Sequence, residues 1–292
     1  MSASFAPATI VSMFERLLPR QVSPPEPSSA RAHAFYVGVG LPSNCSAKGE
    51  FNTLAQSLQE LAARPLIYQT LREQAVAGNV DALNDLGWLF LNGKYWRADH
   101  GLAHRLFRQA AQQGCAKAHY NLAQQYYFGK GLDISYSQVA RFYEQAFELG
   151  LGDAAALLGD LYEEELCLED HQQVNWQPDH DVAYDWYCRG ADAGDIRCRF
   201  EIGTRMLNGA GIERDVEAGL YWLELAAAAG NSEAAEELAF FHSNDGLTQR
   251  YLFWRDQAVA LGSGAALVMK ASDQRRQLAE QETLNAVCST GE

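Results

Sequence analysis

The side chains with the clearest chemical potential lie together in the stretch EDHQQVNWQPDHD. His171 and His180 stand there beside three carboxylates, Asp170, Asp179 and Asp181. Imidazole nitrogens and carboxylate oxygens bind divalent metals, so a metal site, and a metal-dependent hydrolase built on it, is one hypothesis for this stretch. The spacing matches no metal or nucleophile motif, and proximity in a polar loop does not by itself bring ligands together. We therefore predict no metal, no cofactor and no catalytic residue.

Cysteines and glycine-rich tripeptides are the other two features that could carry chemistry. The six cysteines contain no C-x-x-C pair and no zinc-finger spacing, which favours buried or idle thiols in a reducing compartment. The tripeptides Gly129-Lys130-Gly131 and Gly209-Ala210-Gly211 could suggest a phosphate loop. They follow predicted helices rather than strands, however, and no Gly-Lys-Ser or Gly-Lys-Thr sequence is present there. We interpret them as turns.

The composition limits the classes of function. Of the 292 residues, 48% are hydrophobic, which is enough for one large domain or for a repeat array with a continuous core. The net charge of −14 disfavours binding to nucleic acid or to an anionic membrane surface. No apolar run reaches the roughly 18 residues of a membrane span, and the N-terminus lacks the features of a secretory signal. We therefore expect a cytoplasmic protein.

The elements that position these side chains repeat along the chain. Six glycines, each after a predicted helix, recur at intervals of 36, 36, 44, 36 and 32 residues, a period typical of stacked helical units. A small residue, usually Ala or Gly, occurs four and nine residues after them, and a large apolar residue occurs eight residues after the first five. The interval of 44 indicates an eight-residue insertion after Tyr162. The six glycines are Gly78, Gly114, Gly150, Gly194, Gly230 and Gly262.

A second helix precedes each glycine and completes a pair. In this helix a large side chain stands eight residues before five of the glycines, and a small residue stands four residues before them. Large side chains of one helix can therefore pack against small residues of the other. In the sequence NGAGIERDVEAGLYWLELAAAAGN, the alanines at 226–229 are the predicted close-packing face. Gly230 is the predicted left-handed residue that ends the helix and reverses the chain. The large residues are Leu106, Phe142, Trp186, Trp222 and Trp254.

The pattern A-x-x-x-L-G-x-x-Y, then G-x-G, then A-x-x-W-Y-x-x-A-A-x-x-G resembles the Sel-1-like repeat, a relative of the tetratricopeptide repeat. It is clearest in residues 194–230 and extends from about Pro65 to Ala271, with Cys198 in place of the usual Ala. The resemblance implies an all-α fold, a right-handed α/α superhelix of about six antiparallel helix pairs. It also implies a protein that binds other proteins and carries no catalytic residue. Bacterial relatives often serve secretion, including immunity to type VI effectors.

The predicted organisation has three parts. Residues 1–47 form an N-terminal segment with a short helix and a Pro/Ser-rich linker. Residues 48–272 form the solenoid, with an acidic insertion at about 163–180. Residues 273–292 form a C-terminal capping helix and tail.

Negative charge is concentrated around the insertion. Residues 142–188 contain twelve Asp or Glu and no Lys or Arg. A run of like charge is typical of a solvated face, and it also suits a docking surface for a basic partner. The sequence leaves both interpretations open.

A surface for partner binding follows from the resemblance. In the tetratricopeptide relatives the first helix of each pair lines the concave side, which directs positions six, ten and thirteen after each glycine into a groove. Aromatic and carboxylate side chains there suit a peptide or helix with apolar anchors and basic residues. Burial by superhelical packing is the alternative for each of them. The predicted groove residues are Asn84, Trp88, Tyr120, Gln124, Tyr127, Asp160, Glu163, Phe200, Thr204, Glu236 and Phe240.

The predicted function is that of a scaffold or adaptor that binds another protein through this groove and the acidic surface. Its narrower form is an accessory or immunity protein for a type VI secretion effector. The alternatives are a metal-dependent enzyme built on the insertion and a regulatory protein that associates with itself.

Overall fold

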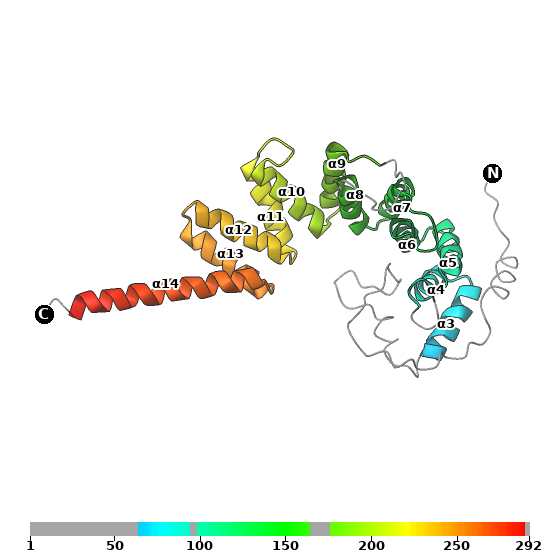
Figure 1. The fold of residues 1–292 in the computed structure, drawn as a ribbon, viewed down its shortest axis with the longest axis horizontal. Coiled ribbons are helices and arrows are strands. Elements are labelled where there is room, and N and C mark those ends of the chain that lie inside the picture. The colour runs from blue at the N-terminus through cyan, green and yellow to red at the C-terminus, as the bar shows by residue number, and fades with distance from the viewer. Residues whose placement is uncertain (1–63, 94–97, 164–175, 290–292) are drawn as a thin grey trace. The chain divides into compact units, whose positions relative to one another are not determined.

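Figure 1 shows the computed structural model, which describes residues 64–93, 98–163 and 176–289. Within these ranges the chain forms twelve α-helices, α3 to α14, and no strand. This confirms the predicted all-α fold of repeated helix pairs. The predicted N-terminal segment, residues 1–47, lies outside the described residues, and so does most of the acidic insertion, residues 164–175.

Residues 1–178 form the first of two compact units. Within it each described helix packs against the next, and the closest pairs are α4 with α5 and α6 with α7. These are pairs that the spacing of the glycines and small residues predicted. The helices are α3 (Arg64–Val76), α4 (Val80–Asn92), α5 (His100–Gln112), α6 (Ala116–Tyr127), α7 (Tyr136–Glu148) and α8 (Asp153–Glu163).

Residues 179–292 form the second unit. Its helices also pack in sequence order, with α10 against α11 and α12 against α13 as the closest pairs. The predicted boundary at residue 272 falls inside α14, which continues without a break. The helices are α9 (His180–Asp192), α10 (Ile196–Asn208), α11 (Val216–Ala228), α12 (Ser232–Asn244), α13 (Thr248–Ala260) and α14 (Gly264–Ser289).

The turn at Gly230 has the left-handed geometry that the sequence predicts. Gly230 has a φ of +104°, which a residue with a Cβ rarely adopts. Its N–H donates to the carbonyl of Ala227, and the N–H of Asn231 donates to the carbonyl of Ala226, both at 3.0 Å. This pair of bonds closes the end of α11 and lets the chain reverse. The other five repeat glycines have φ between 84° and 95°.

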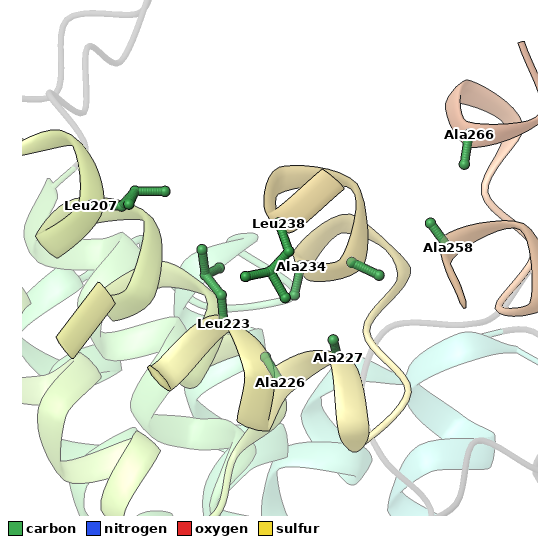
Figure 2. Packing of buried hydrophobic residues seen from close by; sticks show 9 residues of the cluster. Leu207, Leu223, Ala226, Ala227, Ala234, Leu238, Ala258 and Ala266 are labelled. Carbon is green, nitrogen blue, oxygen red and sulfur yellow. The ribbon is translucent and has the colours of Figure 1, made fainter. Parts of the chain in front are cut away.

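The alanines before Gly230 divide into two pairs. Ala226 and Ala227 are buried and point into the apolar cluster of the second unit, as Figure 2 shows. Ala228 and Ala229 are exposed, so the predicted packing face is right for the first two and wrong for the last two. The reason is the 3.6-residue period of the helix, which turns successive residues to different sides.

Small residues allow α10 and α11 to approach closely. A Cβ placed on Gly203 would lie 2.8 Å from Cγ of Leu223 and 3.1 Å from the carbonyl oxygen of Gly219. On Gly219 it would lie 2.7 Å from the backbone nitrogen of Leu207. These distances leave no room for a methyl group at either position, which is why the ninth position after the glycine is small.

A polar network attaches α14 to α13. Arg255, which is buried, contacts Asp273 at 2.6 Å and Asp256 at 2.9 Å. The hydroxyl of Tyr251 donates to Asp273 at 2.5 Å, and Lys270 lies 3.1 Å from Asp256. In the earlier helix pairs the place of Arg255, seven residues before the glycine, is taken by a buried apolar or aromatic side chain. The contact between α13 and α14 therefore adds a charged network to the apolar packing of Ala258 and Ala266.

Candidate functional site

Three predicted groove residues share one half-buried side of α6. Tyr120, Gln124 and Tyr127 follow one another at helical spacing, and we call them the α6 face. Behind them lies Tyr143 of α7. The ring centroids of Tyr120 and Tyr143 are 5.4 Å apart, and the side-chain amide of Gln124 donates a hydrogen bond to the Tyr143 hydroxyl.

Tyr143 links the α6 face to α8. Burial raises the pKa of the Tyr143 hydroxyl well above its ordinary value, and the nearby Tyr120 and the charge of Asp160 raise it further. The hydroxyl is therefore neutral at physiological pH. The helix α8, which carries Asp160, packs against α7, which carries Tyr143. Glu163 follows Asp160 by three residues and shares its side of the helix.

Aromatic rings continue from the α6 face toward the end of the insertion. The centroid of Tyr127 lies 5.9 Å from that of Tyr136, which lies 6.3 Å from that of Trp176. The ring of Trp176 in turn lies 4.9 Å from that of Tyr162. We call these four residues the aromatic row. Its members come from α6, α7, α8 and the chain just before α9.

Trp176 adds a ring contact that has no counterpart in the repeat consensus. In the preceding repeat, Tyr126 occupies the twelfth position after the glycine and stacks on Phe142 of α7, with centroids 5.8 Å apart and an interplanar angle of 17°. Tyr162 holds the same position in its own repeat, and its ring packs against Trp176. The indole N–H of Trp176 donates to the carbonyl of Leu161 at 2.9 Å, which fixes the ring against α8.

Tyr143, Tyr136 and Trp176 were not predicted from the sequence. Tyr143 and Tyr136 stand at ordinary core positions of a second helix, and nothing in their spacing marks a link to the α6 face. Trp176 did carry a signal, since it is the one aromatic residue in the polar stretch EDHQQVNWQPDHD. A large ring in such a stretch indicates a point where the chain packs back on the fold.

Two predicted groove residues of α4 are buried. Asn84 is 0% exposed and Trp88 is 1% exposed. Asn84 accepts a hydrogen bond from the side-chain amide of Asn121, at 2.8 Å, which connects α4 to α6. Neither side chain offers a partner an exposed surface in this structure, and their role in binding stays a prediction.

The predicted groove residues of the second unit differ among themselves. Phe200 is partly buried against the apolar cluster, and Thr204 is half-buried on the same helix. Glu236 accepts a hydrogen bond from the hydroxyl of Ser263, so it connects α12 to the start of α14. Phe240 is 57% exposed and is therefore open to contact.

The metal hypothesis finds little support among the described residues. Asp179 caps α9 by accepting a hydrogen bond from the backbone N–H of Val182 at 3.1 Å, and His180 is exposed. Asp170 and His171 lie outside the described residues. In the part of the chain that the structure describes, no group of three or more His, Cys, Asp or Glu side chains is arranged to hold a metal ion.

The cysteines and the glycine-rich tripeptides have structural explanations. Burial raises the pKa of the Cys115 and Cys188 thiols, which makes each a poorer nucleophile at neutral pH. Gly129 and Gly209 have φ of +60° and +70° and lie in turns between paired helices, as predicted. Among helices α3 to α14, none is both long and apolar enough to cross a membrane.

Stacked helix pairs with a half-buried aromatic and carboxylate surface define an α-solenoid of the protein-binding class. The family model of the Sel1 repeat matches residues 80–115, 116–151, 152–195 and 196–231, together just over half of the chain. The chain belongs to the Sel1 repeat family, which confirms the resemblance. Proteins of this family typically bind other proteins and are generally not enzymes. The third matched repeat is the long one that contains the insertion.

Solved structures and a curated relative are consistent with this assignment. A Sel1 repeat protein from Oxalobacter formigenes has a TM-score of 0.57 at 27% identity, covering 66% of this chain and 78% of its own. A protective antigen with the SLR fold from uropathogenic Escherichia coli has a TM-score of 0.54 at 21% identity, covering 73% and 47%. An uncharacterized protein of Neisseria meningitidis serogroup B is 28% identical over 129 residues, 44% of this chain. The match spans only 25% of that relative's length.

Proposed function

We propose that the protein is a scaffold or adaptor that binds a segment of another protein across the α6 face and the neighbouring carboxylates of α8. The observation that carries the proposal is the convergence on Tyr143, which contacts Tyr120, accepts a hydrogen bond from Gln124 and is affected by the charge of Asp160. These contacts hold the α6 face in place before a partner arrives. A surface that is ordered in advance loses less conformational entropy on binding.

The expected partner segment combines apolar or aromatic anchors with basic residues. Half-buried tyrosines offer a flat apolar ring with a polar edge, a combination that is common at binding hot spots. Asp160 and Glu163 add negative charge, and the surrounding stretch 142–188 contains no Lys or Arg. Such a charge distribution attracts a basic segment and repels an acidic one. In the second unit, the exposed ring of Phe240 is the corresponding candidate contact.

The narrower role suggested by the family resemblance is that of an accessory or immunity protein for a type VI secretion effector, acting in the cytoplasm. It requires the partner to be a secreted effector, so identification of the partner decides it. The alternatives make different predictions. Self-association gives an adduct of twice the chain mass on cross-linking, and a metal-dependent enzyme purifies with a stoichiometric metal.

The test is site-specific photo-cross-linking of the full chain in its native cells. A photoreactive residue replaces Gln124 on the α6 face or, as a control, the exposed Arg105 of α5. We expect one discrete adduct from position 124 that is absent from position 105 and is lost when Tyr127 is changed to Ala. Adducts of the same pattern from both positions, or none from position 124 in a folded protein, would refute the proposal.

A further inference from the structure

We propose that the aromatic row receives an arginine side chain of the bound partner, with the guanidinium stacked on Trp176 and paired with the carboxylate of Glu163 on α8. This inference rests on the proposed function, because it names the chemistry of one anchor of the partner segment. It commits to one occupant, a protein segment that carries arginine.

The ring of Trp176 is held rigidly and is only half-buried. Its N–H is already used in the hydrogen bond to the carbonyl of Leu161. Its flanks are packed by Tyr162, at an interplanar angle of 40°, and by Tyr136, at 57°. An indole that is fixed in this way has no polar group left to offer, so its exposed part can contribute only apolar and π contacts. Among aromatic side chains, tryptophan gives the strongest attraction for a cation.

The chain itself pairs aromatic rings with arginine elsewhere. The guanidinium of Arg189 lies 3.8 Å above the ring of Trp186, and that of Arg141 lies 4.7 Å above the ring of Phe142. Around Trp176 the sequence is different, since residues 142–188 contain twelve carboxylates and no Lys or Arg. Residues 142–188 therefore supply no Lys or Arg for this ring, and their negative charge favours a cation from a bound partner.

The carboxylates favour arginine over lysine. Glu163 directly follows Tyr162 on α8, and Trp176 packs against Tyr162. A planar guanidinium can stack on an indole and at the same time donate two parallel hydrogen bonds to a carboxylate at its edge. An ammonium group is a point charge and makes the two contacts less well together.

The experiment uses the full chain and a panel of 12-residue peptides that carry leucine and arginine at varied spacing. Each peptide has a matched version in which citrulline, a neutral group of nearly the same shape, replaces arginine. Fluorescence polarisation of the labelled peptides gives the dissociation constants. We expect at least one arginine peptide to bind, and its citrulline version to bind about tenfold more weakly.

Variants of the protein test whether the difference between arginine and citrulline peptides arises at the aromatic row. Trp176→Leu should weaken binding of the arginine peptide about tenfold and leave the citrulline peptide unchanged, which is the signature of a direct pairwise contact. Glu163→Gln should weaken the arginine peptide and reduce the salt dependence of its binding. Phe253→Leu, a change of an exposed ring on α13, is the matched control and should have no effect. Circular dichroism and melting curves confirm that each variant is folded.

Three results would overturn the inference: no peptide of the panel binds, arginine and citrulline peptides bind equally, or Trp176→Leu leaves arginine binding unchanged. An apolar occupant would appear as tighter binding of the citrulline peptides. The proposed function is judged separately. If the cross-link from position 124 still forms while these results are negative, the scaffold function stands and only the arginine anchor is wrong.

Discussion

Replacing Gly203 by alanine tests whether the helix pairs depend on backbone contact at the small positions. The added Cβ would lie 2.8 Å from Cγ of Leu223, 3.0 Å from its backbone nitrogen and 3.1 Å from the carbonyl oxygen of Gly219. Carbon atoms in contact prefer separations of about 3.5–4.0 Å, so α10 and α11 must move apart by up to about 1 Å. Two of the three neighbouring atoms belong to the backbone of α11, and a change of side-chain rotamer cannot relieve those contacts.

The magnitude follows from two opposing terms. Overpacking a well-packed interior costs about 1–3 kcal/mol, and a contact with backbone atoms belongs in the upper part of that range. Alanine in place of glycine inside a helix contributes about 1 kcal/mol of stabilisation. We therefore expect Gly203→Ala to lower the free energy of unfolding by about 1–2 kcal/mol.

The control is Gly264→Ala in the same unit, where an added Cβ meets no atom within 4 Å. It should change the free energy of unfolding by no more than about 0.5 kcal/mol. Urea unfolding is followed by circular dichroism and by tryptophan fluorescence, because a repeat protein need not unfold in one step. If Gly203→Ala is as stable as the parent chain, the account of close packing at this position is wrong.

Three further predictions concern buried side chains. Trp88→Ala should lower the free energy of unfolding by about 3–5 kcal/mol, measured in urea, because the ring is buried in the core. Burial alone would raise the pKa of the Asp273 carboxyl, but hydrogen bonds from Tyr251 and Arg255 lower it below its ordinary value. The ionised carboxylate therefore contributes its full stabilisation above about pH 4, and this stabilisation is lost as the pH falls through the lowered pKa of the folded chain. Asp273→Asn should therefore destabilise the chain by about 1–3 kcal/mol at pH 7 and much less at pH 2; an equal loss at both would contradict this. Burial lowers the pKa of His242. As the pH falls, the unfolded chain therefore takes up a proton at this residue near pH 6.5, before the folded chain does, and the free energy of unfolding should fall from pH 7 to pH 5. In urea unfolding at the two pH values, His242→Leu should flatten this decline, and an unchanged decline would contradict the assignment.

The repeat could be predicted from the sequence because its signals are local. A glycine at a left-handed turn, such as Gly230, is required by backbone geometry alone, and six of them at a regular interval fix the succession of helices. Small residues at positions such as Gly203 mark a close contact whatever the partner helix is. Such features depend on a few neighbouring residues, so they are visible without knowledge of the fold.

The surface could be predicted only in part, because exposure depends on what lies across from each position. Trp88 and Gln124 hold the same position, ten residues after their glycines, yet Trp88 is buried and Gln124 is half-buried. The rule based on position treats them alike. Tyr143 was missed for the same reason, since a core position of α7 gives no sign of its bond to Gln124.

Specific chemistry in this protein is expected where one repeat departs from the others. The regular positions are occupied by core packing, as the stacking of Tyr126 on Phe142 illustrates. In the next repeat the insertion supplies Trp176 as a neighbour of Tyr162, within the stretch that lacks basic residues. A scaffold shared by many proteins can distinguish partners only through such differences. Shortening the insertion to restore the 36-residue period should therefore leave a folded solenoid and remove selective binding of arginine peptides, and retention of that selectivity would contradict this view.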